Sequence, residues 1–230
     1  MSNYLVLERY AVSPKIFKSI TIFLVFWFFL FGSLISAWAT PAIKILVLGD
    51  SLAAGYGLLA GQSFPARLEV RLRSIGRNVR VLNGGVSGDT SAGGRSRLSW
   101  ALADKPNFVI IELGANDGLR GLDPVAMRDN LEDIILRLKA FDIGILLTGM
   151  RAPPNIGPNY GRVFNSVFAD LAQKHEVPLY PFFLEGVAAI PSLNQRDGIH
   201  PNSRGVAEIV DRITPFVVRL LEGQPKVGIN

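Results

Sequence analysis

Three polar residues of this sequence have the types and the spacing that a catalytic triad requires. Ser51 follows directly after an apolar run, in the segment Gly49-Asp50-Ser51-Leu52. Near the other end of the chain, Asp197 precedes His200 by three residues. A serine hydroxyl becomes a nucleophile when a histidine accepts its proton and a carboxylate fixes the tautomer of that histidine. The sequence therefore predicts nucleophilic acyl transfer by Ser51, His200 and Asp197.

Each of these residues also has a structural alternative. Ser51 or Asp50 could cap the helix that follows the apolar run. Asp197 and His200 could be polar members of a loop that enters the last helix. The other histidine, His175, lies at the end of an expected helix, where histidines often interact with helix carbonyls, so we expect it to be structural.

Two glycine-containing loops could donate hydrogen bonds to the oxyanion that acyl transfer creates. In Gly84-Gly85-Val86-Ser87-Gly88-Asp89-Thr90, the backbone N–H of Gly88 could point into the cleft. In Gly114-Ala115-Asn116-Asp117, the side-chain amide of Asn116 could do the same. The alternatives are a phosphate-binding loop for the first segment and a helix cap for the second. The first segment lacks both the Lys-Ser/Thr ending of a P-loop and the G-x-G-x-x-G spacing.

The elements that must position these loops are short apolar runs that alternate with helical patterns. The strand predictions are 43–48, 79–83, 108–113, 143–148 and 177–180, and the helix predictions are 64–76, 95–104, 124–141, 160–175 and 202–221. The runs lack period-two alternation, as is typical of strands buried on both faces. Such a pattern predicts a single three-layer α/β/α domain with a parallel five-stranded sheet, whose ligands bind at the carboxyl ends of the strands.

Residues 1–39 have the pattern of an export signal. Two lysines precede an apolar stretch of about a dozen residues, and the small-residue site Ala37-Trp38-Ala39 follows it. Cleavage after this site would leave a mature domain of residues 40–230 in the periplasm. The alternative is an uncleaved membrane anchor formed by residues 20–39, which are long enough to span a bilayer. Both interpretations place the rest of the chain outside the cytoplasm, because the basic residues stay inside.

Charge and cysteine content exclude several classes of protein. The net charge of +5 falls to about +3 without the N-terminal segment, which is too small to argue for nucleic acid. The chain has no cysteine, so it has no disulfide, zinc–thiolate site, cysteine nucleophile or lipidated N-terminal cysteine. We expect no nucleic-acid partner and no obligate protein partner.

Four segments together resemble the SGNH, or GDSL-type, hydrolase family. They are Gly49-Asp50-Ser51-Leu52, Gly88, Gly114-Ala115-Asn116-Asp117 and Asp197-Gly198-Ile199-His200, in the order of that family. Three further segments are similar to the bacterial arylesterase, thioesterase I and lysophospholipase group. These are Ser87-Gly88-Asp89-Thr90-Ser91, Asn116-Asp117-Gly118-Leu119-Arg120-Gly121 and Pro158-Asn159-Tyr160-Gly161.

The resemblance implies a flavodoxin-like sheet, no metal and no organic cofactor. It implies that the oxyanion donors are the Asn116 side chain and the backbone N–H groups of Gly88 and Ser51. It also implies a broad range of small acyl ester and thioester substrates, lysophospholipids among them, usually met in the periplasm. Other possibilities left open are a carbohydrate O-acetylesterase of the cell envelope and a non-catalytic flavodoxin-like binding module.

One loop departs from the pattern of that group. The segment 151–158 is a few residues longer than the group leads us to expect. It follows the fourth predicted strand, so it belongs at the same edge of the sheet as Ser51. We expect its apolar neighbours Ile156 and Tyr160 to bind substrate by covering a fatty acyl chain. The alternative is a plain connecting loop.

Overall fold

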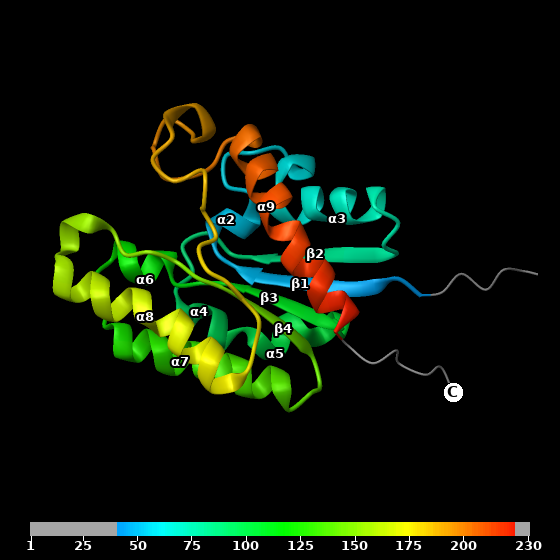
Figure 1. The fold of residues 1–230 in the computed structure, drawn as a ribbon, viewed down its shortest axis with the longest axis horizontal. Helices are drawn as coiled ribbons and strands as arrows, with labels where there is room; N and C mark the ends of the chain where they lie inside the picture. Colours follow the sequence, from blue (N-terminus) through cyan, green and yellow to red (C-terminus); the bar gives the residue numbers. More distant parts are fainter. Residues whose placement is uncertain (1–40, 224–230) are drawn as a thin grey trace, which may run out of the picture. The chain divides into compact units, whose positions relative to one another are not determined.

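A computed structural model of the chain describes residues 41–223. Within this range five parallel strands form one sheet in the order β2-β1-β3-β4-β5, with helices on both faces (Figure 1). The strands are β1 (Ile43–Gly49), β2 (Val79–Gly85), β3 (Phe108–Glu112), β4 (Gly144–Thr148) and β5 (Leu179–Tyr180). This is the flavodoxin-like strand order, so the predicted fold class is confirmed. The expected export signal lies outside the described residues.

The helices form two groups that cover opposite faces of the sheet. Their bounds are α2 (Ser51–Ala54), α3 (Phe64–Ser74), α4 (Ser91–Ser96), α5 (Leu98–Ala101), α6 (Ala115–Leu119), α7 (Pro124–Lys139), α8 (Pro158–His175) and α9 (Ser203–Glu222). Helix α3 packs against α9 on one face, and α7 packs against α4 and α8 on the other (Figure 1). The sequence predictions gave no range for α2 or α6, because helices of one turn have no apolar periodicity to read. The single helix expected at 95–104 is wrong, since the chain forms α4, α5 and a 3-10 turn (Leu102–Asp104) there.

Two of the long helices begin at residues whose side chains cap them. Asp123 accepts a hydrogen bond from the Val125 N–H at the start of α7, where Pro124 occupies the first helical position. Asn202 accepts from the Arg204 and Gly205 N–H groups at the start of α9. These side chains satisfy N–H groups that have no partner inside the helix. The cap of α9 fixes where that helix begins, directly after the loop that carries His200.

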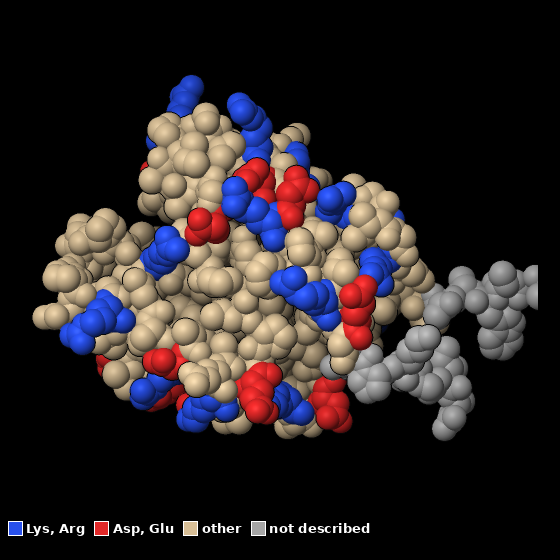
Figure 2. All heavy atoms as spheres, viewed as in Figure 1, with Lys and Arg blue, Asp and Glu red and all other residues tan. Residues whose placement is uncertain are grey.

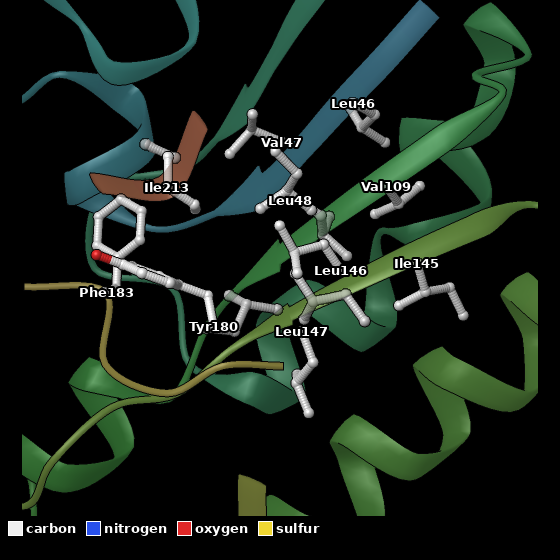
Figure 3. Close-up of a cluster of buried hydrophobic side chains, with 14 of the residues drawn as sticks. Leu46, Val47, Leu48, Val109, Ile145, Leu146, Leu147, Tyr180, Phe183 and Ile213 are labelled. Carbon is white, nitrogen blue, oxygen red and sulfur yellow. The ribbon is translucent and has the colours of Figure 1, made fainter. Parts of the chain in front are cut away.

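The core consists of the three inner strands and the helix faces that pack against them. Figure 3 shows part of this core, in which side chains from β1, β3 and β4 meet Tyr180, Phe183 and Ile213. All five residues of β3 and of β4 are buried, as predicted for strands covered on both faces. The prediction is wrong for β2, where Arg80 and Asn83 are exposed, because β2 lies at the edge of the sheet.

The surface carries mixed charges. Figure 2 shows basic and acidic side chains interspersed on the face in view, without a continuous field of one sign. Over the described range, none of the helices is both long enough and apolar enough to cross a bilayer. In the same part of the chain, no cluster of three or more His, Asp or Glu side chains could hold a metal ion.

Candidate active site

The structure brings together the three residues of the predicted triad. Ser51 is the first residue of α2, directly beyond the carboxyl end of β1. His200 Nε2 lies 2.9 Å from Ser51 Oγ, and His200 Nδ1 lies 2.7 Å from Asp197 Oδ2. Both are hydrogen-bond distances. The two ring nitrogens thus face the hydroxyl and the carboxylate that the sequence assigned to them.

A tight loop between β5 and α9 holds the histidine in place. The carboxylate of Asp197 accepts the backbone N–H groups of Ile199 and His200 at 3.0 Å each, through Oδ1. The N–H of Gln195 donates to the carbonyl of His200 at 2.7 Å and closes the loop. Gly198 has φ of +70°, in the left-handed region that favours glycine. Asp197 therefore shapes the backbone of the loop with one oxygen and orients the imidazole with the other.

The electrostatics of this loop keep Asp197 ionised. Hydrogen bonds from the backbone N–H groups of His200 and Ile199, followed by the His200 side chain, lower the pKa of Asp197 from 3.8 to about 2. A carboxylate that stays ionised at neutral pH can stabilise an imidazolium formed on His200. The loop is also tied to the turn that follows α2, because Gln195 Nε2 donates to the carbonyl of Tyr56 at 2.7 Å. The Tyr56 ring lies 4.6 Å from the His200 ring.

The residue before the serine is a buried acid. Asp50 Oδ1 accepts the N–H of Leu52 at 2.9 Å and caps α2. The capping alternative thus holds for Asp50 but not for Ser51, whose hydroxyl reaches His200. Burial raises the pKa of Asp50 from 3.8 to about 6. A second acid, Glu112, is fully buried at the end of β3, and desolvation followed by the nearby Asp50 charge raises its pKa well above 4.5.

The predicted oxyanion donors surround the serine, but they differ in their availability. Asn116 Nδ2 donates to Asp50 Oδ2 at 3.1 Å and to the carbonyl of Asp89 at 2.9 Å. Both hydrogens of its amide are thus engaged, and an oxyanion must replace one of these acceptors. Gly88, with φ of +83°, has its carbonyl held by Arg120 Nη2 at 2.8 Å. The N–H groups of Gly88 and Ser51 have no hydrogen-bond acceptor within residues 41–223.

A mostly apolar cavity of about 490 Å³ opens beside Ser51. Its apolar wall includes Leu119, Met150, Ala152, Pro153, Pro154, Phe182, Leu184 and Ile199. The loop after β4 reaches this cavity through residues 151–154. A cavity of this lining can hold a hydrocarbon chain, since burial of each methylene contributes about 0.8 kcal/mol.

The structure corrects the expectation for Ile156 and Tyr160, because neither residue lines this cavity. The Tyr160 hydroxyl donates to the carbonyl of Leu122 at 2.7 Å, and its ring stacks on Phe164. Tyr160 therefore joins α8 to the connection between α6 and α7. Ile156 lies near Gly121 of that same connection. The sequence placed the loop at the correct edge of the sheet but could not show which of its side chains turn inward.

Two other polar residues hold pairs of helices together. His175 Nε2 lies 2.8 Å from Glu132 Oε1 on α7, so its partner is a carboxylate rather than the helix carbonyl that we expected. Asp117 accepts the N–H and the hydroxyl of Ser91 at 2.8 and 2.6 Å. It thereby holds the start of α4 instead of capping its own helix.

Sequence reasoning missed Glu112, Gln195 and Tyr56 as parts of the site. One local signal was available for Glu112, which is the single charged residue at the end of the buried strand Phe108–Glu112. A charge in such a place needs a partner. Gln195 and Tyr56 carry no comparable signal, since their contact joins residues 139 positions apart.

Known proteins are similar to this chain in sequence. Residues 47–207 match the sequence profile of the GDSL-like Lipase/Acylhydrolase family. Esterase TesA of Pseudomonas aeruginosa is 42% identical over 181 residues, which cover 78% of this chain and 90% of that protein. Thioesterase 1/protease 1/lysophospholipase L1 of Escherichia coli K12 is 41% identical over 184 residues, 80% of this chain and 87% of that protein.

A solved structure extends the likeness to three dimensions. The crystal structure of AlinE4, described as an SGNH-hydrolase family esterase, superposes with a TM-score of 0.67 at 50% sequence identity. The superposition covers 79% of this chain and 98% of that one. The likeness thus extends over most of the length of both proteins.

The buried acid at the end of β3 predicts an unusual dependence of stability on pH. Because the pKa of Glu112 is raised above 4.5 in the folded protein, the native state keeps a proton that the unfolded chain releases. This stabilisation is fully present below pH 4.5 and is lost as the pH rises through the folded-state pKa, by about 1.4 kcal/mol per pH unit. We expect the free energy of unfolding of the wild type to fall relative to that of Glu112→Gln as the pH rises above 5. Urea unfolding of both proteins at several pH values would measure the difference, and parallel curves would contradict the prediction.

Proposed function

This chain belongs to the GDSL-like lipase/acylhydrolase family and is a hydrolase of the SGNH esterase type; on that premise we propose that it cleaves acyl esters and thioesters with Ser51 as its nucleophile. The observation that carries the proposal is the 2.9 Å contact between Ser51 Oγ and His200 Nε2 beside an apolar cavity. A hydroxyl, a base and an orienting carboxylate in this geometry are the groups that covalent acyl transfer requires.

In the first half of the proposed reaction the serine acquires the acyl group. His200 Nε2 removes the hydroxyl proton of Ser51 as Oγ attacks the carbonyl carbon of the substrate. Asp197, ionised and bonded to Nδ1, stabilises the imidazolium. The tetrahedral intermediate then collapses, and the leaving alcohol or thiol takes its proton from His200. In the second half, His200 accepts a proton from water as the water attacks the acyl-enzyme. It then returns that proton to Ser51 Oγ as the carboxylic acid leaves.

The oxyanion of each tetrahedral intermediate needs donors that are already in place. The unpaired N–H groups of Ser51 and Gly88 serve this role. Asn116 contributes its side-chain amide when the substrate oxygen replaces the Asp50 carboxylate as acceptor for one amide hydrogen. Arg120 holds the carbonyl of Gly88. This contact keeps the Gly88 backbone in the orientation in which its own N–H can reach the oxyanion.

The lining of the cavity indicates the class of substrate. A wall of leucine, methionine, proline and phenylalanine side chains suits a hydrocarbon acyl chain better than an acetylated sugar, which would need a polar groove. This favours the acyl ester and thioester assignment over a carbohydrate O-acetylesterase. The Escherichia coli relative bears the name thioesterase 1/protease 1/lysophospholipase L1, and we include thioesters and lysophospholipids among the proposed substrates.

The proposal extends to the cellular location of the enzyme. Residues 1–39 carry a basic start, an apolar centre and a small-residue site in the order of a cleaved export signal. We propose that they direct export and that the hydrolase domain, residues 40–230, acts in the periplasm. The membrane anchor of residues 20–39 is the alternative that the experiment below separates from cleavage.

A fluorophosphonate probe tests the nucleophile, because only an activated serine reacts with it. The wild type should be labelled at Ser51. Ser51→Ala and His200→Ala should lower kcat by a factor on the order of 10⁶, and Asp197→Ala somewhat less. His175→Ala is the matched control and should keep its rate. It removes a histidine bonded to a carboxylate at the end of α8 that leads into β5, at the opposite edge of the parallel sheet from Ser51. Near-normal turnover by purified Ser51→Ala would disprove the assignment.

Acyl-chain preference tests the role of the cavity. Leu184→Ala removes apolar wall and should lower kcat/KM for a medium-chain ester more than for an acetate ester, by roughly 0.8 kcal/mol per methylene that loses its contact. Ile156→Ala, outside the cavity lining, should leave the ratio of the two kcat/KM values unchanged. If Ile156→Ala changes this ratio and Leu184→Ala does not, the acyl chain contacts Ile156, and the proposed cavity wall is wrong.

N-terminal sequencing of the protein recovered from cell fractions tests export. We expect the periplasmic protein to begin at Thr40, because signal peptidase cleaves after the small-residue site. Recovery of membrane-bound protein that begins at Met1 or Ser2 would establish the anchor instead.

A further inference from the structure

A buried carboxyl lies beneath the nucleophile and takes no part in the mechanism above. Glu112 ends β3, and its register partner on the neighbouring strand β1 is Gly49, two residues before Ser51. The Glu112 side chain is fully buried. We propose that Glu112 is a positioning residue, which holds the turn that carries Ser51 in its reactive geometry. The inference rests on the proposed role of Ser51 as nucleophile and adds the group that orients it.

Glu112 binds the backbone on both sides of the serine. Its Oε2 accepts the N–H of Asp50 and the N–H of Ala53, each at 3.2 Å. Helix α2 has only four residues, and the first N–H groups of any helix have no acceptor inside it. The Leu52 N–H is taken by the Asp50 side chain. Of the four N–H groups from Asp50 to Ala53, the two carboxyl groups thus occupy three and leave the Ser51 N–H free for an oxyanion.

The space beneath the turn is fitted to this carboxyl. A Cβ added to Gly49 would lie 2.4 Å from Glu112 Oε2 and 2.7 Å from the Cβ of Ala53. Both separations are far below van der Waals contact, and φ of Gly49 is not in the left-handed region. Glycine is therefore required at this position by the room that Glu112 occupies. The carboxyl thus lies directly against the backbone of Gly49.

The chemistry of the group indicates that it works as a neutral acceptor. Complete burial disfavours its charged form. Its other oxygen, Oε1, has no hydrogen-bond partner in the described part of the chain and is the oxygen left to carry a proton. A neutral carbonyl oxygen at the position of Oε2 would therefore serve as well, whereas a shorter side chain would leave two buried N–H groups without an acceptor.

Two conservative substitutions of Glu112 distinguish the effect of side-chain length on kcat from the effect of the acidic group. Glu112→Gln keeps an oxygen at the same reach and loses the acid, and it should rescue most of the wild-type kcat. Glu112→Asp keeps the acid but is shorter by one methylene, and it should lower kcat on the order of 10²-fold with little change in KM, because a displaced nucleophile reacts slowly while the cavity is intact. Both are assayed with a p-nitrophenyl ester, at a temperature where circular dichroism shows that they are folded.

Thr148→Val is the matched control. It also removes a buried hydrogen bond at the end of a neighbouring strand, from Thr148 Oγ1 to the carbonyl of Ile111, and should lower the melting temperature without lowering kcat. If Glu112→Asp does not fold, Glu112→Met replaces it as a side chain of similar length without an acceptor. The inference is overturned if Glu112→Asp, or Glu112→Met in its place, keeps the wild-type kcat. It is also overturned if kcat falls as far in Glu112→Gln or in Thr148→Val as it does in that variant.

Labelling of the wild type keeps this test distinct from that of the proposed function. A fluorophosphonate that fails to label Ser51 in the wild type would refute the nucleophile itself. Labelling of Ser51 in the wild type, together with full kcat in Glu112→Asp, would refute only the role of Glu112.

Discussion

The hydrogen bond between Ser51 and His200 joins two residues that lie 149 positions apart in the sequence. Two connections of the sheet bring them together, one after β1 and one after β5. The serine needs only the short turn after β1. The histidine needs more, because β5 lies at the sheet edge and the chain must return from there to β1. It does so through a segment anchored by the buried side chains of Phe183 and Val187 and closed by the pairing of Asn194 with Pro201.

Acids with opposite properties surround this hydrogen bond. Asp197 is partly exposed and is bound by N–H groups, which favour its ionised form. Asp50 and Glu112 are buried, which favours their neutral forms. Burial of two acids costs stability that apolar residues would not cost. The contacts of these acids with the backbone around Ser51 and with Asn116 give a reason for their presence, since those contacts order groups that have to be in place before the substrate arrives.

The sequence was a good guide where the signal is local. Apolar runs located all five strands to within a few residues. Residue types just beyond strand ends pointed to Ser51 and Asn116, and the three-residue spacing of Asp197 and His200 pointed to the other two residues. It was a poor guide where tertiary contacts decide. Whether Tyr160 faces the cavity or the α6–α7 connection depends on carbonyls some 40 residues away. The exposure of Arg80 and Asn83 in β2 likewise depends on the place of that strand at the edge, and apolar character alone cannot reveal strand order.

The close approach of Gly49 to Glu112 has a consequence for how this enzyme can evolve. Any side chain at position 49 would overlap the carboxyl at position 112, and a shorter acid at position 112 would leave the backbone of the turn without its acceptor. Glu112→Gln keeps the acceptor, so the acid can be exchanged for an amide in one step while Gly49 stays. A side chain at position 49 has no such step, because the backbone of Glu112 and the side chain of Ala53 crowd the same space as the carboxyl. The turn can therefore change the acidity of the group beneath it more easily than it can change its glycine.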